Sequence, residues 1–177
     1  MTTASSSKSA KIGAPAWVLA LIFPLLLGEA CAETLEGYVL GVSDGDTITV
    51  LNAKHQQLRV RIASIDAPER WQPFFKPSQE NLRKLVRHKD VVVEWHKKDH
   101  YGRLVGMVFL RGRDVGLEQV RAGLAWWYRE HAMEYALDER EGYDAAEKNA
   151  RKRRLGLWAD AAPVPPWEFR SKGLNAR

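Results

Sequence analysis

The sequence predicts an α+β fold, in which a five-stranded antiparallel β-barrel of the OB type carries three packed helices. Segments with strand-like alternation of apolar residues are interspersed with segments that have helical spacing. The connections between consecutive strands are too short for parallel crossovers, which need about a dozen residues or more. The chain has 177 residues, and we expect one folded domain over residues 33–160.

The strands are expected where apolar and polar residues alternate with a period of two. Residues 33–51 show this alternation with a break at Asp-Gly-Asp, which favours two strands or one bent ribbon. A polar hairpin turn at 52–56 leads into a strand at 58–62, whose alternation sets Arg61 opposite the core-facing residues. The remaining strands are expected at residues 91–95 and 104–110.

Three helices are expected from apolar residues at helical spacing. The first covers residues 78–88 with Ser78 as its N-cap. The second begins near residue 117 and ends near the aromatic residues 126–128. The third carries apolar residues from position 143 onward and stops at Gly156. The Pro-rich tail, residues 161–177, is expected to be extended and only partly ordered.

Residues 1–32 have the organisation of a signal peptide. Lys8 and Lys11 form a positive region, residues 16–27 are apolar, and Ala30-Cys31-Ala32 supplies the small residues of a cleavage site. Cleavage there would make the protein secreted or periplasmic, with no stable membrane association. An uncleaved signal anchor and a lipid-anchored Cys31 are the alternatives. Because Cys31 is the only cysteine, the cleaved chain has no disulfide and depends on its hydrophobic core.

The charge of the chain favours a polyanionic partner. The formal net charge is +5, and removal of residues 1–32, which carry two lysines and one glutamate, leaves +4. Such a domain attracts nucleic acid, acidic polysaccharide or an anionic lipid surface. Charge alone does not choose among these, and a monomer is the default expectation.

Three motifs together supply the groups that cleavage of a phosphodiester needs. They are Asp44-Gly45-Asp46-Thr47, then Arg61 with Asp66-Ala67-Pro68-Glu69, and then Asp99-His100-Tyr101-Gly102-Arg103. They provide hard anionic oxygens, a separate carboxylate and two guanidiniums, which suits hydrolysis assisted by a hard divalent cation. Each motif taken alone is typical of a turn or a strand end. Their combination favours a catalytic site.

The same motifs, in this order, resemble the staphylococcal-type thermonuclease family over residues 35–158. Residues 44–69 match the first signature of that family, and residues 99–103 match the second, with His100 where lysine or arginine is usual. Residues 120–128 and 156–158 also resemble the family.

The resemblance implies a role for each matching residue. Calcium would be held by Asp46, Asp66 and the backbone carbonyl of Ala67, with Glu69 as general base, Arg61 and Arg103 on the scissile phosphate, and His100, Tyr101 and Tyr128 as further substrate contacts. The family usually has threonine at the position of Ala67, and a main-chain ligand tolerates that change. A histidine at position 100 is mostly neutral at pH 7, so its phosphate contact would be weaker or pH-dependent.

The function expected from this resemblance is that of a calcium-dependent, sugar-nonspecific nuclease. It would cut DNA and RNA, favour single-stranded or frayed regions and leave 3′-phosphate ends. Two rival hypotheses come from other classes of protein. One is a noncatalytic OB-type nucleic-acid-binding module, and the other is an anchored surface protein that binds extracellular polyanion.

Overall fold

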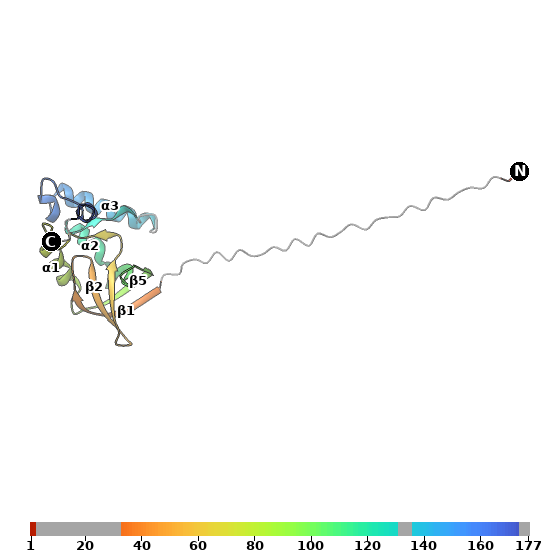
Figure 1. Cartoon of the computed structure of the whole chain (residues 1–177), viewed down its shortest axis with the longest axis horizontal. Helices are drawn as coiled ribbons and strands as arrows, with labels where there is room; N and C mark the ends of the chain where they lie inside the picture. Colours follow the sequence, from red (N-terminus) through yellow and green to blue (C-terminus); the bar gives the residue numbers. More distant parts are fainter. Residues whose placement is uncertain (3–32, 131–135, 174–177) are drawn as a thin grey trace.

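The computed structural model describes residues 1–2, 33–130 and 136–173. The predicted signal peptide therefore lies, apart from its first two residues, outside the described residues. Among the helices of the described part, none is long and apolar enough to cross a membrane. In Figure 1 the strands β1, β2 and β5 form the lower part of the domain, and α2 and α3 lie above them.

Five strands close into the predicted barrel. They are β1 (Glu33–Val42), β2 (Thr47–Asn52), β3 (Gln57–Ile62), β5 (Asp90–Lys98) and β6 (Leu104–Leu110), hydrogen-bonded in the order β3-β2-β1-β5-β6. The predicted fold class is confirmed. One pairing differs from the expected antiparallel pattern, because β3 closes the barrel against β6 in parallel, with Val60 opposite Leu104. These two strands are not consecutive, so the long segment between them can serve as the crossover that parallel pairing requires.

The core of the barrel is made by the inward positions of these strands. Alternate residues are fully buried, which is what a period of two predicts for a barrel interior. The members of the core without exposed surface include Val39, Ile48, Val50, Val60, Ile62, Val93 and Val108. Arg61 lies between Val60 and Ile62 and so points to the opposite face, as the sequence predicts.

Helix α1 (Phe75–Val86) begins earlier than the sequence predicts. Its N-cap is Phe74, in a left-handed conformation with φ of 67°, and Ser78 already donates its N–H to the carbonyl of Phe74 at 2.9 Å. Ser78 is therefore not the N-cap but a fully buried residue of the first turn. Pro77 does not prevent this earlier start, because it is the third residue of the helix, and the N–H groups of the first three have no partner within it.

Helix α2 (Val115–Arg121) follows the two-residue strand β7 (Arg113–Asp114) and is shorter than predicted. Asp114 caps it, since its side chain accepts hydrogen bonds from two N–H groups of the first turn. Gly123, with φ of 68°, ends the helical path. The aromatic residues expected at the end of the helix instead form strand β8 (Trp126–Trp127), which pairs with β4 (Ile65–Asp66).

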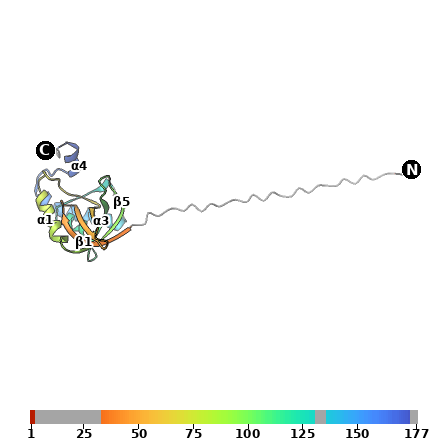
Figure 2. The ribbon, with the colours of Figure 1, turned by 60° about the horizontal axis from the view of Figure 1, so that its bottom comes forward.

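The C-terminal part is more helical than the sequence predicts. Helix α3 (Leu137–Lys152) ends before Gly156, which begins a short 3-10 helix at Gly156–Ala159. The tail is not simply extended, because it contains helix α4 (Pro166–Ser171), with Pro165 as N-cap and Pro166 at its first position. Proline favours that position because its fixed φ suits a helix start. Figure 2 shows α4 close to the C-terminus, outside the barrel.

Candidate active site

The turn before β2 places the first carboxylates of the site. Asp44 accepts the N–H of Asp46 at 3.1 Å through its side chain, which tightens the Asp-Gly-Asp turn. Gly45 is required here by close packing. A Cβ at this position would lie 1.9 Å from the hydroxyl oxygen of Ser78 and 2.7 Å from the Cβ of Ala67.

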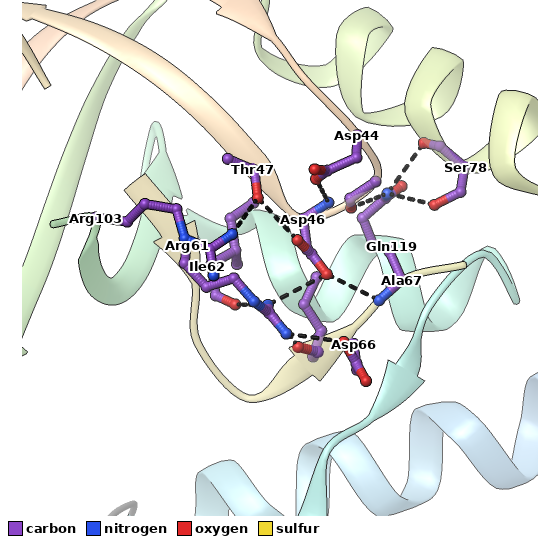
Figure 3. A network of polar contacts seen from close by, with 12 residues as sticks. Asp44, Asp46, Thr47, Arg61, Ile62, Asp66, Ala67, Ser78, Arg103 and Gln119 are labelled. Atoms are coloured by element: carbon purple, nitrogen blue, oxygen red, sulfur yellow. Dashed lines mark hydrogen bonds and ion pairs between the residues drawn. The ribbon is translucent and has the colours of Figure 1, made fainter. Parts of the chain in front are cut away.

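Gln119, on α2, fixes this turn from inside the protein. Its amide nitrogen donates to the carbonyl of Gly45 at 2.8 Å and to the carbonyl of Ser78 at 3.2 Å, and the residue is fully buried. Asn81 donates to its amide oxygen at 2.5 Å. Figure 3 shows Gln119 reaching toward the turn. No sequence signal points to Gln119, because a single glutamine within an apolar stripe forms no motif.

Arg61, on β3, bridges the two carboxylates predicted to hold a cation. Its Nη1 lies 3.3 Å from Asp46 Oδ2, and its Nη2 lies 2.9 Å from Asp66 Oδ1 (Figure 3). Nη1 also donates at 2.8 Å to the carbonyls of Ile62 and Ile65. A guanidinium with this many partners is held in one orientation. The side chains of Asp46, Arg61 and Asp66 therefore lie in contact with one another.

Burial raises the pKa of two acidic residues here, Asp66 and Asp44. Burial raises the pKa of Asp66 to about 6, with the charge of Asp46 adding to this effect, although Arg170 and Arg61 lower it. Burial, followed by the charge of Asp46, raises the pKa of Asp44 to about 7. When carboxylates lie close together in a region of low dielectric, a positive charge between them stabilises their ionised form. The electrostatics thus favour a cation here.

The donor atoms fit a hard divalent cation. Asp46 and Asp66 offer carboxylate oxygens, and the backbone of Ala67 lies against them, since its N–H donates to Asp46 Oδ2 at 2.9 Å. Within the described residues no group of three or more histidine, cysteine, aspartate or glutamate side chains forms a metal cluster. An ion would be held by two carboxylates, a main-chain oxygen and water. Such a set suits calcium or magnesium better than zinc.

Arg103 is joined to the same site through Thr47. Its Nη1 donates to Thr47 Oγ1 at 3.3 Å, and that hydroxyl donates to Asp46 Oδ1 at 3.0 Å. Asp99 holds the other side of the guanidinium, since Arg103 Nε lies 2.7 Å from its Oδ2. Partial burial of Asp99 acts to raise its pKa, but the hydrogen bonds from Arg103 outweigh it and the pKa lies below its usual value.

Glu69 lies at the edge of the site and is partly exposed. Its backbone N–H donates to the side chain of Gln72 at 2.8 Å, and its carboxylate accepts from Arg170 at 2.7 Å. Arg170 also donates to both oxygens of Asp66, at 3.2 and 2.9 Å. Arg170 has no sequence signal of its own, because it lies outside the three motifs in a tail that the sequence predicts to be extended.

A pocket of about 300 Å³ opens beside these groups. Of the twelve described residues that line it, half are basic or aromatic, and Asp99 is the one acidic residue among the others; the basic and aromatic ones are Arg61, Lys97, His100, Arg103, Tyr128 and Arg170. The ring of His100 lies 3.8 Å from that of Tyr101, and Tyr101 is exposed over 69% of its surface, 5.4 Å from the guanidinium of Arg103. A positively charged pocket next to the acidic pair, Asp46 and Asp66, can hold a phosphate group beside a bound cation.

The structure therefore brings the predicted site residues together. Asp46, Arg61, Asp66 and Ala67 are in direct contact. Arg103 is linked to them through Thr47, and Glu69 is linked through Arg170. His100 and Tyr128 line the adjoining pocket, whereas Tyr101 is not part of its lining and lies beside the guanidinium of Arg103. The roles assigned to these residues stay predictions.

Comparison with known proteins gives the family of the chain. Residues 59–160 match the family described as staphylococcal nuclease homologue. The chain is 38% identical over 143 residues to an uncharacterized endonuclease of Escherichia coli O157:H7, covering 80% of this chain and 88% of that protein. It is 37% identical over 153 residues to an uncharacterized endonuclease of Haemophilus influenzae, covering 86% and 82%.

A third relative carries a more specific name. The chain is 34% identical over 161 residues to a micrococcal nuclease of Shigella flexneri, covering 86% of this chain and 90% of that protein. The family match over residues 59–160 includes the second and third motifs, while the first motif, residues 44–47, precedes it. These similarities establish that the chain belongs to the staphylococcal nuclease family.

Proposed function

We propose that this protein is an exported, calcium-dependent, sugar-nonspecific nuclease that hydrolyses phosphodiester bonds of DNA and RNA and leaves 3′-phosphate ends. Nuclease chemistry, with nucleic acid as substrate, is supported by the family and by the names of the relatives. The observation that carries the proposal is Arg61, which joins Asp46 and Asp66 beside a basic pocket. Calcium, export and the type of product go beyond that support and are parts of the proposal to be tested.

In this proposal the arginines bind the scissile phosphate. Arg61 and Arg103 both line the pocket, so one phosphate group there can contact both guanidiniums. Negative charge on the phosphoryl oxygens grows toward the five-coordinate transition state, and fixed cationic donors stabilise it most at that stage. A bound calcium ion at Asp46, Asp66 and Ala67 would add Lewis-acid polarisation of the same phosphate.

Glu69 would take the proton of the attacking water. The carboxylate is partly exposed, so water can reach it, and its contact with Arg170 holds it toward Asp66. General-base assistance of this kind contributes typically about a hundredfold or more. Tyr101, His100 and Tyr128 would contact flanking phosphates and a base.

Low sequence specificity follows from the types of side chain in the pocket. Guanidiniums and lysine contact phosphates, which are the same at every nucleotide, and an aromatic ring stacks on any base. Both DNA and RNA can satisfy such contacts. Single strands and frayed ends expose their bases, which favours them over paired duplex.

A cleavage assay tests the proposal directly. Purified protein is incubated with supercoiled plasmid and, separately, with single-stranded RNA, in calcium or in excess chelator, and Glu69→Gln serves as the matched catalytic control. We expect both substrates to be cut in calcium only, with fragments that phosphatase treatment converts into primers for a polymerase. Binding without cleavage in calcium would instead identify the noncatalytic OB-type module.

Export is tested separately from catalysis. Expression of the full chain in a Gram-negative host, followed by fractionation and N-terminal sequencing, should give a periplasmic or secreted protein that begins near Glu33. Recovery in the membrane fraction with residues 1–32 still attached would indicate a signal anchor. Size-exclusion chromatography tests the expected monomer in the same preparation.

A further inference from the structure

The C-terminal helix α4 contributes a cationic side chain to the acidic part of the site. Arg170 donates to both carboxylate oxygens of Asp66, at 3.2 and 2.9 Å, and to Glu69 at 2.7 Å. Asp66 is buried, while Arg170 is partly exposed. A paired contact of a guanidinium with a carboxylate has fixed geometry and is among the stronger ion pairs in proteins. The contact joins the predicted metal ligand to the predicted general base.

The segment that carries Arg170 is docked on the same region at two further points. Trp167 lies 6.2 Å from the ring of Trp126 and 5.6 Å from the ring of Tyr128. Gln72 donates to the carbonyl of Val164 at 2.9 Å, and its side-chain oxygen accepts the N–H of Glu69 at 2.8 Å. One glutamine thus links the backbone of the tail to the backbone of Glu69. Arg170 is placed by packing and not by a chance surface contact.

Arg170 occupies the carboxylate oxygen that a cation needs. Within the described residues, Asp66 Oδ2 accepts a hydrogen bond from Arg170, whereas Oδ1 is shared between Arg170 and Arg61. A divalent cation that takes Asp66 Oδ2 as a ligand must replace this guanidinium, because the two positive charges would repel each other at the same oxygen. The two occupants therefore exclude one another.

We infer that Arg170 is a positioning residue that holds Asp66 and Glu69 together in the cation-free protein and competes with the cation for Asp66. This inference rests on the proposed calcium-dependent function and adds a form of regulation to it. The arginine keeps the crowded carboxylates neutralised before the ion binds. It also raises the calcium concentration at which the site fills.

Calcium binding, measured by isothermal titration calorimetry on the full-length protein, tests the competition without using activity. Breaking a partly exposed pair of this kind costs on the order of 1 kcal/mol. Removing the competitor should therefore tighten calcium binding of Arg170→Ala about fivefold relative to wild type. Arg170→Lys should fall between the two, since an ammonium cannot form the paired contact.

Lys172→Ala is the matched control, because it removes one positive charge from the same segment. Lys172 faces Glu168, with 3.8 Å between the charged atoms, and not the acidic pair. Its substitution should change the affinity for calcium less than twofold, because only the long-range electrostatic effect of one positive charge is lost. Equal effects of the two alanine variants, or weaker calcium binding in Arg170→Ala, would overturn the inference.

The outcomes also separate this inference from the proposed function. If all variants bind calcium equally and still cut plasmid in calcium, the inference fails while the proposed function stands. If neither wild type nor Arg170→Ala binds calcium, the inference and the calcium dependence fail together. Circular dichroism of each variant shows whether it is folded, and Arg170→Lys keeps the test decisive should the alanine variant be unstable.

Discussion

The two sides of the site are built differently. The acidic side, formed by Asp46, Arg61 and Asp66, is buried and held by ion pairs that Arg61 makes to both carboxylates, and Arg170 reaches Asp66 from 104 positions away. The hairpin side, residues 99–103, is more exposed and is fixed mostly within itself, because Asp99 accepts from the N–H groups of Tyr101 and Arg103. Substitutions on the acidic side should therefore change both stability and cleavage. Substitutions on the hairpin side should change cleavage alone.

Arg61→Ala should give the largest loss of stability and thus tests the acidic side most severely. It leaves buried carboxylates without their bridging partner, which costs about 3 kcal/mol or more in the free energy of unfolding. Urea denaturation followed by tryptophan fluorescence, in chelator, measures this loss, and the plasmid assay should show no cleavage. A loss below about 1 kcal/mol would show that the acidic side does not depend on this arginine.

Gln119→Leu should give the second largest loss of stability, because it removes buried hydrogen bonds without making a large cavity. The carbonyls of Gly45 and Ser78 lose their donor, at a cost of about 2 kcal/mol. Cleavage should also fall, since Gln119 supports the turn that carries Asp46. Gln57→Leu, at an exposed position of β3, is the control and should unfold at the urea concentration of wild type.

Arg103→Ala should separate cleavage from stability. Arg103 is about as buried as Arg61, but its partner Asp99 lies in the same hairpin and keeps the N–H groups of residues 101 and 103 as donors, so the free energy of unfolding should change by less than about 1 kcal/mol. Turnover should fall about a hundredfold or more, as expected when a donor to the transition state is lost. Arg113→Ala, on the exposed end of β7, is the control, and unchanged turnover of Arg103→Ala would discredit the assignment.

His100→Lys should have the smallest effect and no effect on stability. Lysine brings a full positive charge to this position, so a phosphate contact here would strengthen and lower KM about threefold at low salt. The gain should disappear at high ionic strength, where exposed charges are screened. A KM that is the same in both proteins at every salt concentration would show that position 100 contacts no phosphate.

The sequence was a good guide to the strands and the motifs. Alternation over residues 33–51 and 58–62 predicts β1, β2 and β3, because a barrel strand has one buried face and one outward face. The same alternation correctly placed Arg61 on the outer face. The helix boundaries were less accurate. Serine is a common N-cap residue, yet Ser78 packs against the Asp-Gly-Asp turn and lies inside α1.

The sequence by itself determined the barrel, the positive charge and the identity of the groups in the site, because these depend on periodicity and on residue types close together in the chain. Only the tertiary structure shows that Gln119 and Arg170 contact the site. Gln119 bonds to Gly45 across 74 positions, and Arg170 bonds to Asp66 across 104. Contacts at such separations are set by how the helices dock on the barrel, which leaves no local pattern in the sequence.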